Sequence, residues 1–335
     1  MKAIKKSQMN DLIQALSVAG QVFVPQEING STKFAPWHKD AKVQLDKNTL
    51  LSPKDTLFPQ TETMYNYVAD NLNTSIEEAA ATTERQIIVG IRPCDVKSVR
   101  LMDLVFLTKG FEDKFYKNKR DNTLLVSVGC DHAEPSCFCT SMGVNPQEEE
   151  GADLALVDLG DEYGVEAKTE AGKELLGQIK SLLADSSKEP VKTSGFQIEF
   201  EGVDQLPAKL KDMFEHPLWD EICLKCIGCG ACTYLCPTCH CFDIQTKKVG
   251  KDGTNYRCWD SCMFGDYALM AGGHDPRPSK KERVRQRFMH KLRYFPERYN
   301  ELMCVGCGRC LAKCPVNVDI TRIIGRIKEA DVNVG

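Results

Sequence analysis

The chain has 335 residues, a formal net charge of −4 and 42% hydrophobic residues. This length suggests two domains with cores of their own, and the acidic balance argues against general affinity for nucleic acids. Seventeen cysteines are too many for an ordinary cytosolic protein, and the chain is too long for a small disulfide scaffold, so metal ligation explains the count better.

The first twenty residues begin with lysines but do not form a signal peptide, because polar residues interrupt the apolar run that such a peptide needs. Leu12, Ile13 and Leu16 instead predict one face of a short helix. No run approaches the ~20 apolar residues of a membrane span. We therefore expect a cytoplasmic protein whose reduced thiols are available to iron.

Residues 1–205 predict a mixed α/β domain. Short apolar runs indicate buried strands, and two of them form a hairpin around Gly160. The predicted strands are 86–91, 123–128, 154–159, 164–167 and 196–200. One helix is expected to start after residue 92 with Asp95 as its N-cap, and another to cover residues 171–184. A short helix at 206–214 leads into Leu218 and Trp219, which we expect to form a hinge.

Residues 206–335 contain the pattern CxxCxxCxxxCP twice. The cysteines of the first copy are Cys226, Cys229, Cys232 and Cys236, and those of the second are Cys304, Cys307, Cys310 and Cys314. This spacing is typical of [4Fe–4S] clusters in bacterial ferredoxins. A pair of zinc sites is the alternative, but zinc would need only CxxC pairs, whereas a third cysteine and the CP ending occur in both copies.

The two motifs are expected to exchange their fourth ligands. Three thiolates on a tight loop can wrap three corners of a cubane, and small glycines let the backbone come close. In two-cluster ferredoxins the cysteine before the proline ligates the other cluster. We therefore assign Cys226, Cys229, Cys232 and Cys314 to cluster 1, and Cys304, Cys307, Cys310 and Cys236 to cluster 2.

Nearly seventy residues separate the motifs, which favours a helical domain over a compact ferredoxin. Helices are predicted at 283–294 and 320–328. The fold class is therefore α+β, a mixed α/β domain followed by a mainly helical dicluster ferredoxin-like domain. Residues 277–298 are strongly basic. Three interpretations of this stretch stay open: a solvated helix face, a docking surface for an acidic partner, and a source of positive field beside the anionic clusters.

Nine further cysteines lie outside the ferredoxin pattern. Four of them belong to the first domain and could hold a third iron–sulfur cluster, namely Cys94, Cys130, Cys137 and Cys139. Buried free thiols are the alternative. The other five match no simple template, namely Cys223, Cys239, Cys241, Cys258 and Cys262. Thiols beside the first motif could tune its potential, form a redox pair or hold an extra metal.

With CPTCHCFDI, RCWDSCMFGDYALMAGGHDPRP and CVGCGRCLAKCPVNVDI, the chain resembles the family of iron–sulfur electron-transfer subunits found in anaerobic sulfite reductase and, as the beta subunit, in sulfhydrogenase. LLSPKDTLFPQTE, IRPCDVKS and CFCTSMG extend the resemblance into the first domain. It implies a cytoplasmic relay between a flavin subunit that oxidises NAD(P)H and a terminal reductase or hydrogenase subunit. It also favours the third cluster in the first domain.

Two other functions stay open at this point. One is a catalytic reductase with its own substrate site near Cys239 and Cys262. The other is a nucleic-acid-binding protein with structural clusters, which only the basic stretch suggests. We predict no catalytic residue, because no dinucleotide fingerprint, P-loop, GxSxG or HExxH is present.

Overall fold

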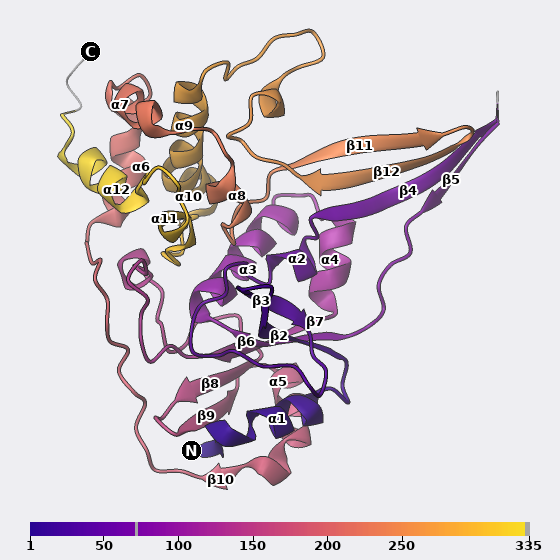
Figure 1. Cartoon of the computed structure of the whole chain (residues 1–335), viewed down its shortest axis with the longest axis vertical. Helices are drawn as coiled ribbons and strands as arrows, with labels where there is room; N and C mark the ends of the chain where they lie inside the picture. Colours follow the sequence, from indigo (N-terminus) through magenta and orange to yellow (C-terminus); the bar gives the residue numbers. More distant parts are fainter. Residues whose placement is uncertain (71–72, 332–335) are drawn as a thin grey trace.

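The computed structural model describes residues 1–70 and 73–331. A sheet-rich N-terminal region is followed by a cluster of helices, and a long β-arm projects from the molecule between them (Figure 1). The α+β prediction is confirmed. No helix within the described residues combines the length and the apolar character that a bilayer crossing requires.

The N-terminal region is built on an eight-stranded sheet in the order β10-β1-β9-β8-β7-β6-β2-β3. The strands are β1 (Lys2–Lys5), β2 (Gln21–Ile28), β3 (Ser31–Pro36), β6 (Gln86–Ile91), β7 (Thr123–Val128), β8 (Leu154–Asp158), β9 (Glu162–Ala167) and β10 (Ala184–Asp185). Strands β2, β6, β7 and β8 run parallel to one another, and the remaining pairs are antiparallel.

Helices cover both faces of this sheet. Helices α1 (Met9–Leu16) and α5 (Glu170–Gln178) lie on one face, and α2 (Lys54–Leu57), α3 (Pro93–Phe106) and α4 (Lys114–Asp121) on the other (Figure 1). In β6, Ile87 and Val89 pack with the core of α1 and α5, while Ile88 packs with that of α3. The strand is buried on both sides, which is why its sequence is apolar without alternation.

Most predicted elements of this region are confirmed, including the strands at 86–91 and 123–128 and the hairpin of β8 and β9. The strand predicted at 196–200 is wrong, because these residues have no regular structure. The second predicted helix ends earlier than expected, at Gln178. Asp95 is not an N-cap: the cap position is Arg92, and Asp95 lies in the first turn of α3.

The C-terminal helices surround a core of their own. They are α6 (Leu206–Lys209), α7 (Leu218–Lys225), α8 (Ala231–Tyr234), α9 (Lys280–Met289), α10 (Phe295–Tyr299), α11 (Arg309–Ala312) and α12 (Ile320–Glu329), with a π-helical turn, His290–Tyr294, between α9 and α10. Leu218 and Trp219 are buried in this core, 2% and 0% exposed. The predicted hinge is therefore wrong, and these residues anchor α7.

The β-arm is a four-stranded antiparallel sheet that the sequence did not lead us to predict. Its order is β11-β12-β4-β5, from β4 (Thr61–Asp70), β5 (Asn73–Glu78), β11 (Phe242–Val249) and β12 (Asp252–Trp259). Two strands come from each side of the predicted boundary at 205/206. That boundary stays a prediction, and the two predicted domains share one sheet.

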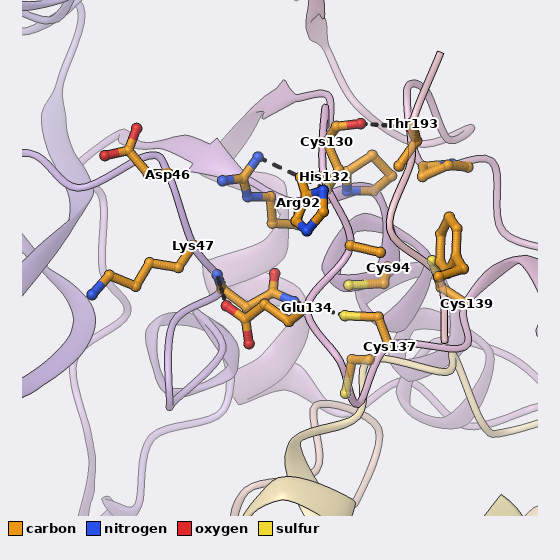
Figure 2. A pocket seen from close by; sticks show the side chains of 16 residues that line it. Asp46, Lys47, Arg92, Cys94, Cys130, His132, Glu134, Cys137, Cys139 and Thr193 are labelled. Atoms are coloured by element: carbon orange, nitrogen blue, oxygen red, sulfur yellow. Dashed lines mark hydrogen bonds between the residues drawn. The ribbon is translucent and has the colours of Figure 1, made fainter. Parts of the chain in front are cut away.

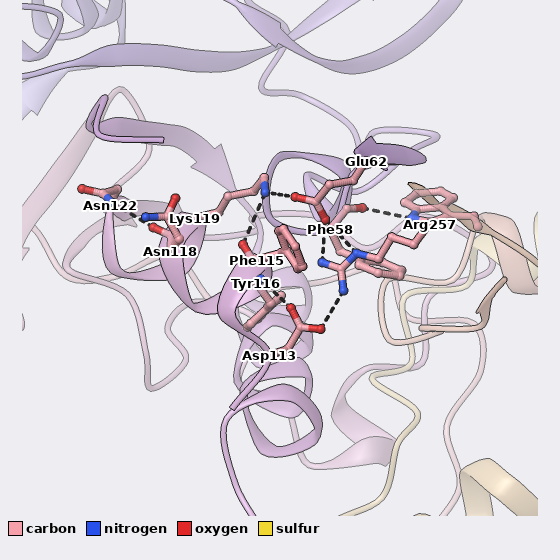
Figure 3. A network of polar contacts seen from close by, with 10 residues as sticks. Phe58, Glu62, Asp113, Phe115, Tyr116, Asn118, Lys119, Asn122 and Arg257 are labelled. Carbon is pink, nitrogen blue, oxygen red and sulfur yellow. Dashed lines mark hydrogen bonds and ion pairs between the residues drawn. The ribbon is translucent and has the colours of Figure 1, made fainter. Parts of the chain in front are cut away.

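A buried arginine joins the base of the arm to the first region (Figure 3). Arg257 of β12 is 1% exposed, and its guanidinium lies 2.7 Å from both the Glu62 and the Asp113 carboxylates. The same guanidinium lies 5.0 Å from the ring centre of Phe58. Glu62 also pairs with Lys119. Glu62 lies on β4 of the same arm, whereas Asp113 precedes α4 of the N-terminal region, so this network couples the arm to that region.

We expect Arg257→Met to lower the free energy of unfolding by about 3 kcal/mol, because removal of one partner leaves buried carboxylates without full compensation. Anaerobic urea unfolding of the cluster-loaded chain measures the change. Lys251→Met is the control, since the Lys251–Asp70 pair of the same arm is exposed and should contribute less than about 1 kcal/mol. Equal unfolding midpoints for the two variants would contradict this role of Arg257.

Candidate metal centres

The four thiols assigned to cluster 1 line one cavity. Cys226, Cys229 and Cys232 come from the loop between α7 and α8 and from the start of α8, and Cys314 arrives from the second motif. Apolar side chains such as Ile227 and Phe288 complete the wall. The structure therefore brings the three thiols of the first motif together with Cys314 of the second motif.

Backbone amides face two of these sulfurs. The amide of Gly228 donates to Cys226 Sγ at 3.4 Å, and that of Val318 donates to Cys314 Sγ at 3.2 Å. Gly228 has a φ of 71°, a left-handed conformation in which glycine is unstrained. Such amide donors stabilise thiolate charge, as expected around an anionic cluster.

The thiols assigned to cluster 2 lie within electrostatic reach of one another. Burial, with a contribution from the neighbouring Cys310 and Cys236, raises the pKa of Cys304 to about 11. Burial also raises the pKa of Cys307 and of Cys310, with Cys236 again contributing. Cys236, from the first motif, is thus a shared neighbour of all three thiols of the second motif.

The four cysteines of the first region also converge on one cavity (Figure 2). Parallel neighbours β6 and β7 explain two of them, because Cys94 and Cys130 follow the carboxyl ends of these strands, where ligands of open sheets bind. Cys137 and Cys139 complete the set from the following loop. Asn48 Nδ2 lies 3.5 Å from Cys137 Sγ, and Arg92 donates to Cys130 Sγ at 3.8 Å.

This cavity adjoins the second motif. Cys307 lines it together with the four thiols of the first region. The amide of Phe138 donates to the carbonyl of Gly306 at 2.9 Å, and a Cβ on Gly306 would come within 2.5 Å of the Cα of Cys139. Gly306 therefore allows two cysteine-bearing loops to pack backbone against backbone. The sequence alone suggested that this glycine lets the backbone come close to the cluster.

Two buried cations provide an independent test of whether anionic clusters fit these sites. Arg287 is 5% exposed and Lys291 is 2% exposed, and within the described chain neither forms an ion pair with a carboxylate. Arg287 lines the cluster 1 cavity, and its Nε has no hydrogen-bond partner in the described structure. Lys291 Nζ lies 3.2 Å from Cys236 Sγ. An uncompensated buried charge costs several kcal/mol, so thiolate-ligated clusters suit these surroundings.

The pKa of Lys291 follows from the same surroundings. Burial alone would lower it, but the charges of Cys236, Cys239 and Cys304 outweigh burial and raise the pKa above its ordinary value. The sequence did not single out Arg287 and Lys291 within the basic stretch. Their spacing of four residues, which places both on one helix face, was the available signal.

The five remaining cysteines do not share one site, but the side chains of Cys241 and Cys262 contact each other, and that of Cys239 contacts Cys236. Cys239 and Cys262 are buried, 8% exposed each, and Cys258 lies within β12. Cys223 Sγ donates to the carbonyl of Asp220 at 3.1 Å. Lys54, also buried, donates to the carbonyls of Cys236 and Cys239 at 3.1 and 2.9 Å. These contacts support structural roles around the first motif.

The thiols of the described residues are free, and they do not gather tightly around single points. Across residues 1–70 and 73–331, no three or more histidine, cysteine or acidic side chains are close enough to hold one metal ion. Tetrahedral zinc would need four ligands within about 2.3 Å of the ion.

Comparison with known proteins agrees with this geometry. Residues 225–318 match the family model described as a 4Fe-4S dicluster domain. Sulfhydrogenase 2 subunit beta of Pyrococcus furiosus is 27% identical, over 95% of this chain and 96% of the relative. No solved structure matches the chain significantly. Residues 225–318 thus resemble a 4Fe-4S dicluster domain, and the chain as a whole is similar to this sulfhydrogenase beta subunit.

Proposed function

We propose that the chain is an iron–sulfur electron-transfer subunit that relays electrons between a flavin subunit oxidising NAD(P)H and a terminal reductase or hydrogenase subunit. The observation that carries the proposal is the adjacency of three thiol-lined sites. Cys307 of cluster 2 borders the cavity of the first region, and Cys236, assigned to cluster 2, follows Cys232 of cluster 1 by four residues in the same motif. Adjacent sites suit short electron-transfer steps.

Two of the sites hold the [4Fe–4S] clusters of the dicluster domain, with the ligands exchanged between motifs as assigned above. The third site, with Cys94, Cys130, Cys137 and Cys139, holds a further iron–sulfur cluster in this proposal. When bound, such clusters supply one-electron couples over roughly −700 to +450 mV. The residues of this chain space the clusters, exclude water and set the surrounding charge.

The relay has an exposed end at cluster 1. Cys229 is exposed, and Ile227 beside it is 59% exposed, whereas Cys304 of cluster 2 is 9% exposed. Electrons would therefore enter or leave at this end through a partner subunit. The homologue is named as a subunit, which favours a hetero-oligomeric complex, and a cytoplasmic location is part of the same proposal.

The two alternatives have less support. A substrate site near Cys239 and Cys262 is disfavoured because both thiols are buried among protein groups. Nucleic-acid binding by the basic stretch is disfavoured because Arg285, Arg287 and Lys291 are buried and cannot reach phosphates. The relay is therefore the function that we retain.

Anaerobic purification with iron, sulfide and EPR analysis tests the function. The chain should contain at least two [4Fe–4S] clusters and, when isolated, exchange electrons with artificial dyes only. Turnover of a physiological substrate by the isolated chain would favour the catalytic alternative instead. Copurification of untagged partners should recover a flavin subunit, together with the terminal enzyme.

Exchange of the fourth ligands predicts effects at a distance in the sequence. Cys236→Ala should damage the cluster at Cys304, Cys307 and Cys310, because it removes one of four thiolates, and should spare cluster 1. Cys314→Ala should do the reverse. EPR spectra of the reduced variants distinguish the clusters, with Cys223→Ala as a control that keeps both. Damage confined to the cluster of the local motif would refute the assignment.

Removal of thiols in the first region tests the third cluster. Cys137→Ala combined with Cys139→Ala should lower iron and sulfide by the content of one cluster, because two of its four ligands are lost. Cys258→Ala, on β12, should leave both contents unchanged. Unaltered iron in the double variant would mean that the four thiols are structural and that only the dicluster part of the relay exists.

A further inference from the structure

We propose that Lys291 and Arg287 set the reduction potentials within the dicluster domain, Lys291 acting on cluster 2 and Arg287 on cluster 1. Both are positioning residues that act through charge. This inference rests on the proposed function, because it requires that the cysteine sites hold redox-active clusters.

Lys291 is attached to both segments that supply cluster 2. Its ammonium lies 3.2 Å from Cys236 Sγ and 3.0 Å from Thr238 Oγ1. Its carbonyl accepts a hydrogen bond from the amide of Met303, the residue before Cys304, at 3.1 Å. One residue of the π-helical turn therefore connects the exchanged ligand with the start of the second cysteine loop. Such turns occur frequently at functional sites.

Arg287 lies one helical turn before Lys291 and lines the cluster 1 cavity together with Cys232 and Cys314. Its side chain is buried, and its Nε has no hydrogen-bond partner within the described structure. A buried cation placed in this way acts on cluster 1.

The sign of the effect follows from charge. Reduction adds one negative charge to a cluster, and a buried cation without a carboxylate partner stabilises the more negative form. Solvent and salt screen this interaction little, because the charges are buried. Each cation therefore raises the reduction potential of the cluster that it faces. Burial of the more negative reduced form would lower this potential, and the cation offsets that decrease.

Three variants on neighbouring positions separate the contributions. Lys291→Met removes the charge at cluster 2, and Arg287→Met removes the charge at cluster 1. Arg285→Met is the matched control, because Arg285 is buried in the same helix but pairs with Glu215 at 3.0 Å. EPR-monitored redox titration of the full, cluster-loaded chain measures the midpoint potentials, and iron analysis measures cluster content.

In Lys291→Met we expect the equilibrium constant for reduction of cluster 2 to fall at least about tenfold. This corresponds to a potential lower by 59 mV for a one-electron couple, and the potential of cluster 1 should be unchanged. Arg287→Met should lower the potential of cluster 1 and leave that of cluster 2 unchanged, and Arg285→Met should change neither. Lys291→Arg should retain the potential of the unmodified chain. If Lys291→Met loses cluster 2 and Lys291→Arg keeps it, the requirement for charge is also supported.

An unchanged potential of cluster 2 in Lys291→Met would overturn the proposal. If both Lys291 variants lose cluster 2, the proposal is tested by the potential of cluster 1 in Arg287→Met. A lower potential supports the proposal, and an unchanged potential overturns it. These results differ from failure of the proposed function, in which the unmodified chain itself would lack two redox-active [4Fe–4S] clusters.

Discussion

The Asp95–Arg309 ion pair is the contact on which the arrangement of the cysteine sites depends. Both side chains are buried, and two guanidinium nitrogens lie 2.5 and 2.7 Å from the two carboxylate oxygens. Asp95 follows Cys94 of the first region, and Arg309 lies between Cys307 and Cys310 of cluster 2. Arg309 Nε also donates to the carbonyl of Thr49 at 2.8 Å. Loss of either partner would leave a buried charge uncompensated at a cost of about 3–5 kcal/mol.

This pair acts together with the close contact of the two loops. Gly308, which precedes Arg309, has a φ of 71° and leaves no room for a Cβ against the backbone of Ser136. Gly306 is confined in the same way by Cys139. The ion pair fixes the orientation of the two regions, and the glycines allow their backbones to meet. The third thiol site and cluster 2 are adjacent for these two reasons together.

The sequence predicted the elements whose patterns are local, and its repeated cysteine spacing indicated which thiols lie together. The apolar run of β6 and the CxxCxxCxxxCP motifs carry their own signals, and Cys314 lies in the cavity of cluster 1 as expected. The β-arm was missed because its pairing is long-range: Glu62 and Arg257 lie opposite each other although 195 residues separate them. Asp95 was misread as a cap because the partner that binds it, Arg309, is also distant in sequence. Burial of Arg287 and Lys291 could not be derived from a stretch that is basic throughout.

The buried cations change how the basic stretch is understood. On a solvated helix face the charges would lie in water. Solvent and salt would then weaken their interaction with clusters more than about 10 Å away. At positions 287 and 291 the charges are instead buried beside thiols from two motifs that must combine to hold the clusters. The same charges that offset the anionic clusters also act on their potentials, because the interaction that stabilises a bound cluster is stronger after reduction. Cluster retention and redox tuning are therefore expected to change together along this helix, and a substitution that conserves charge should preserve both.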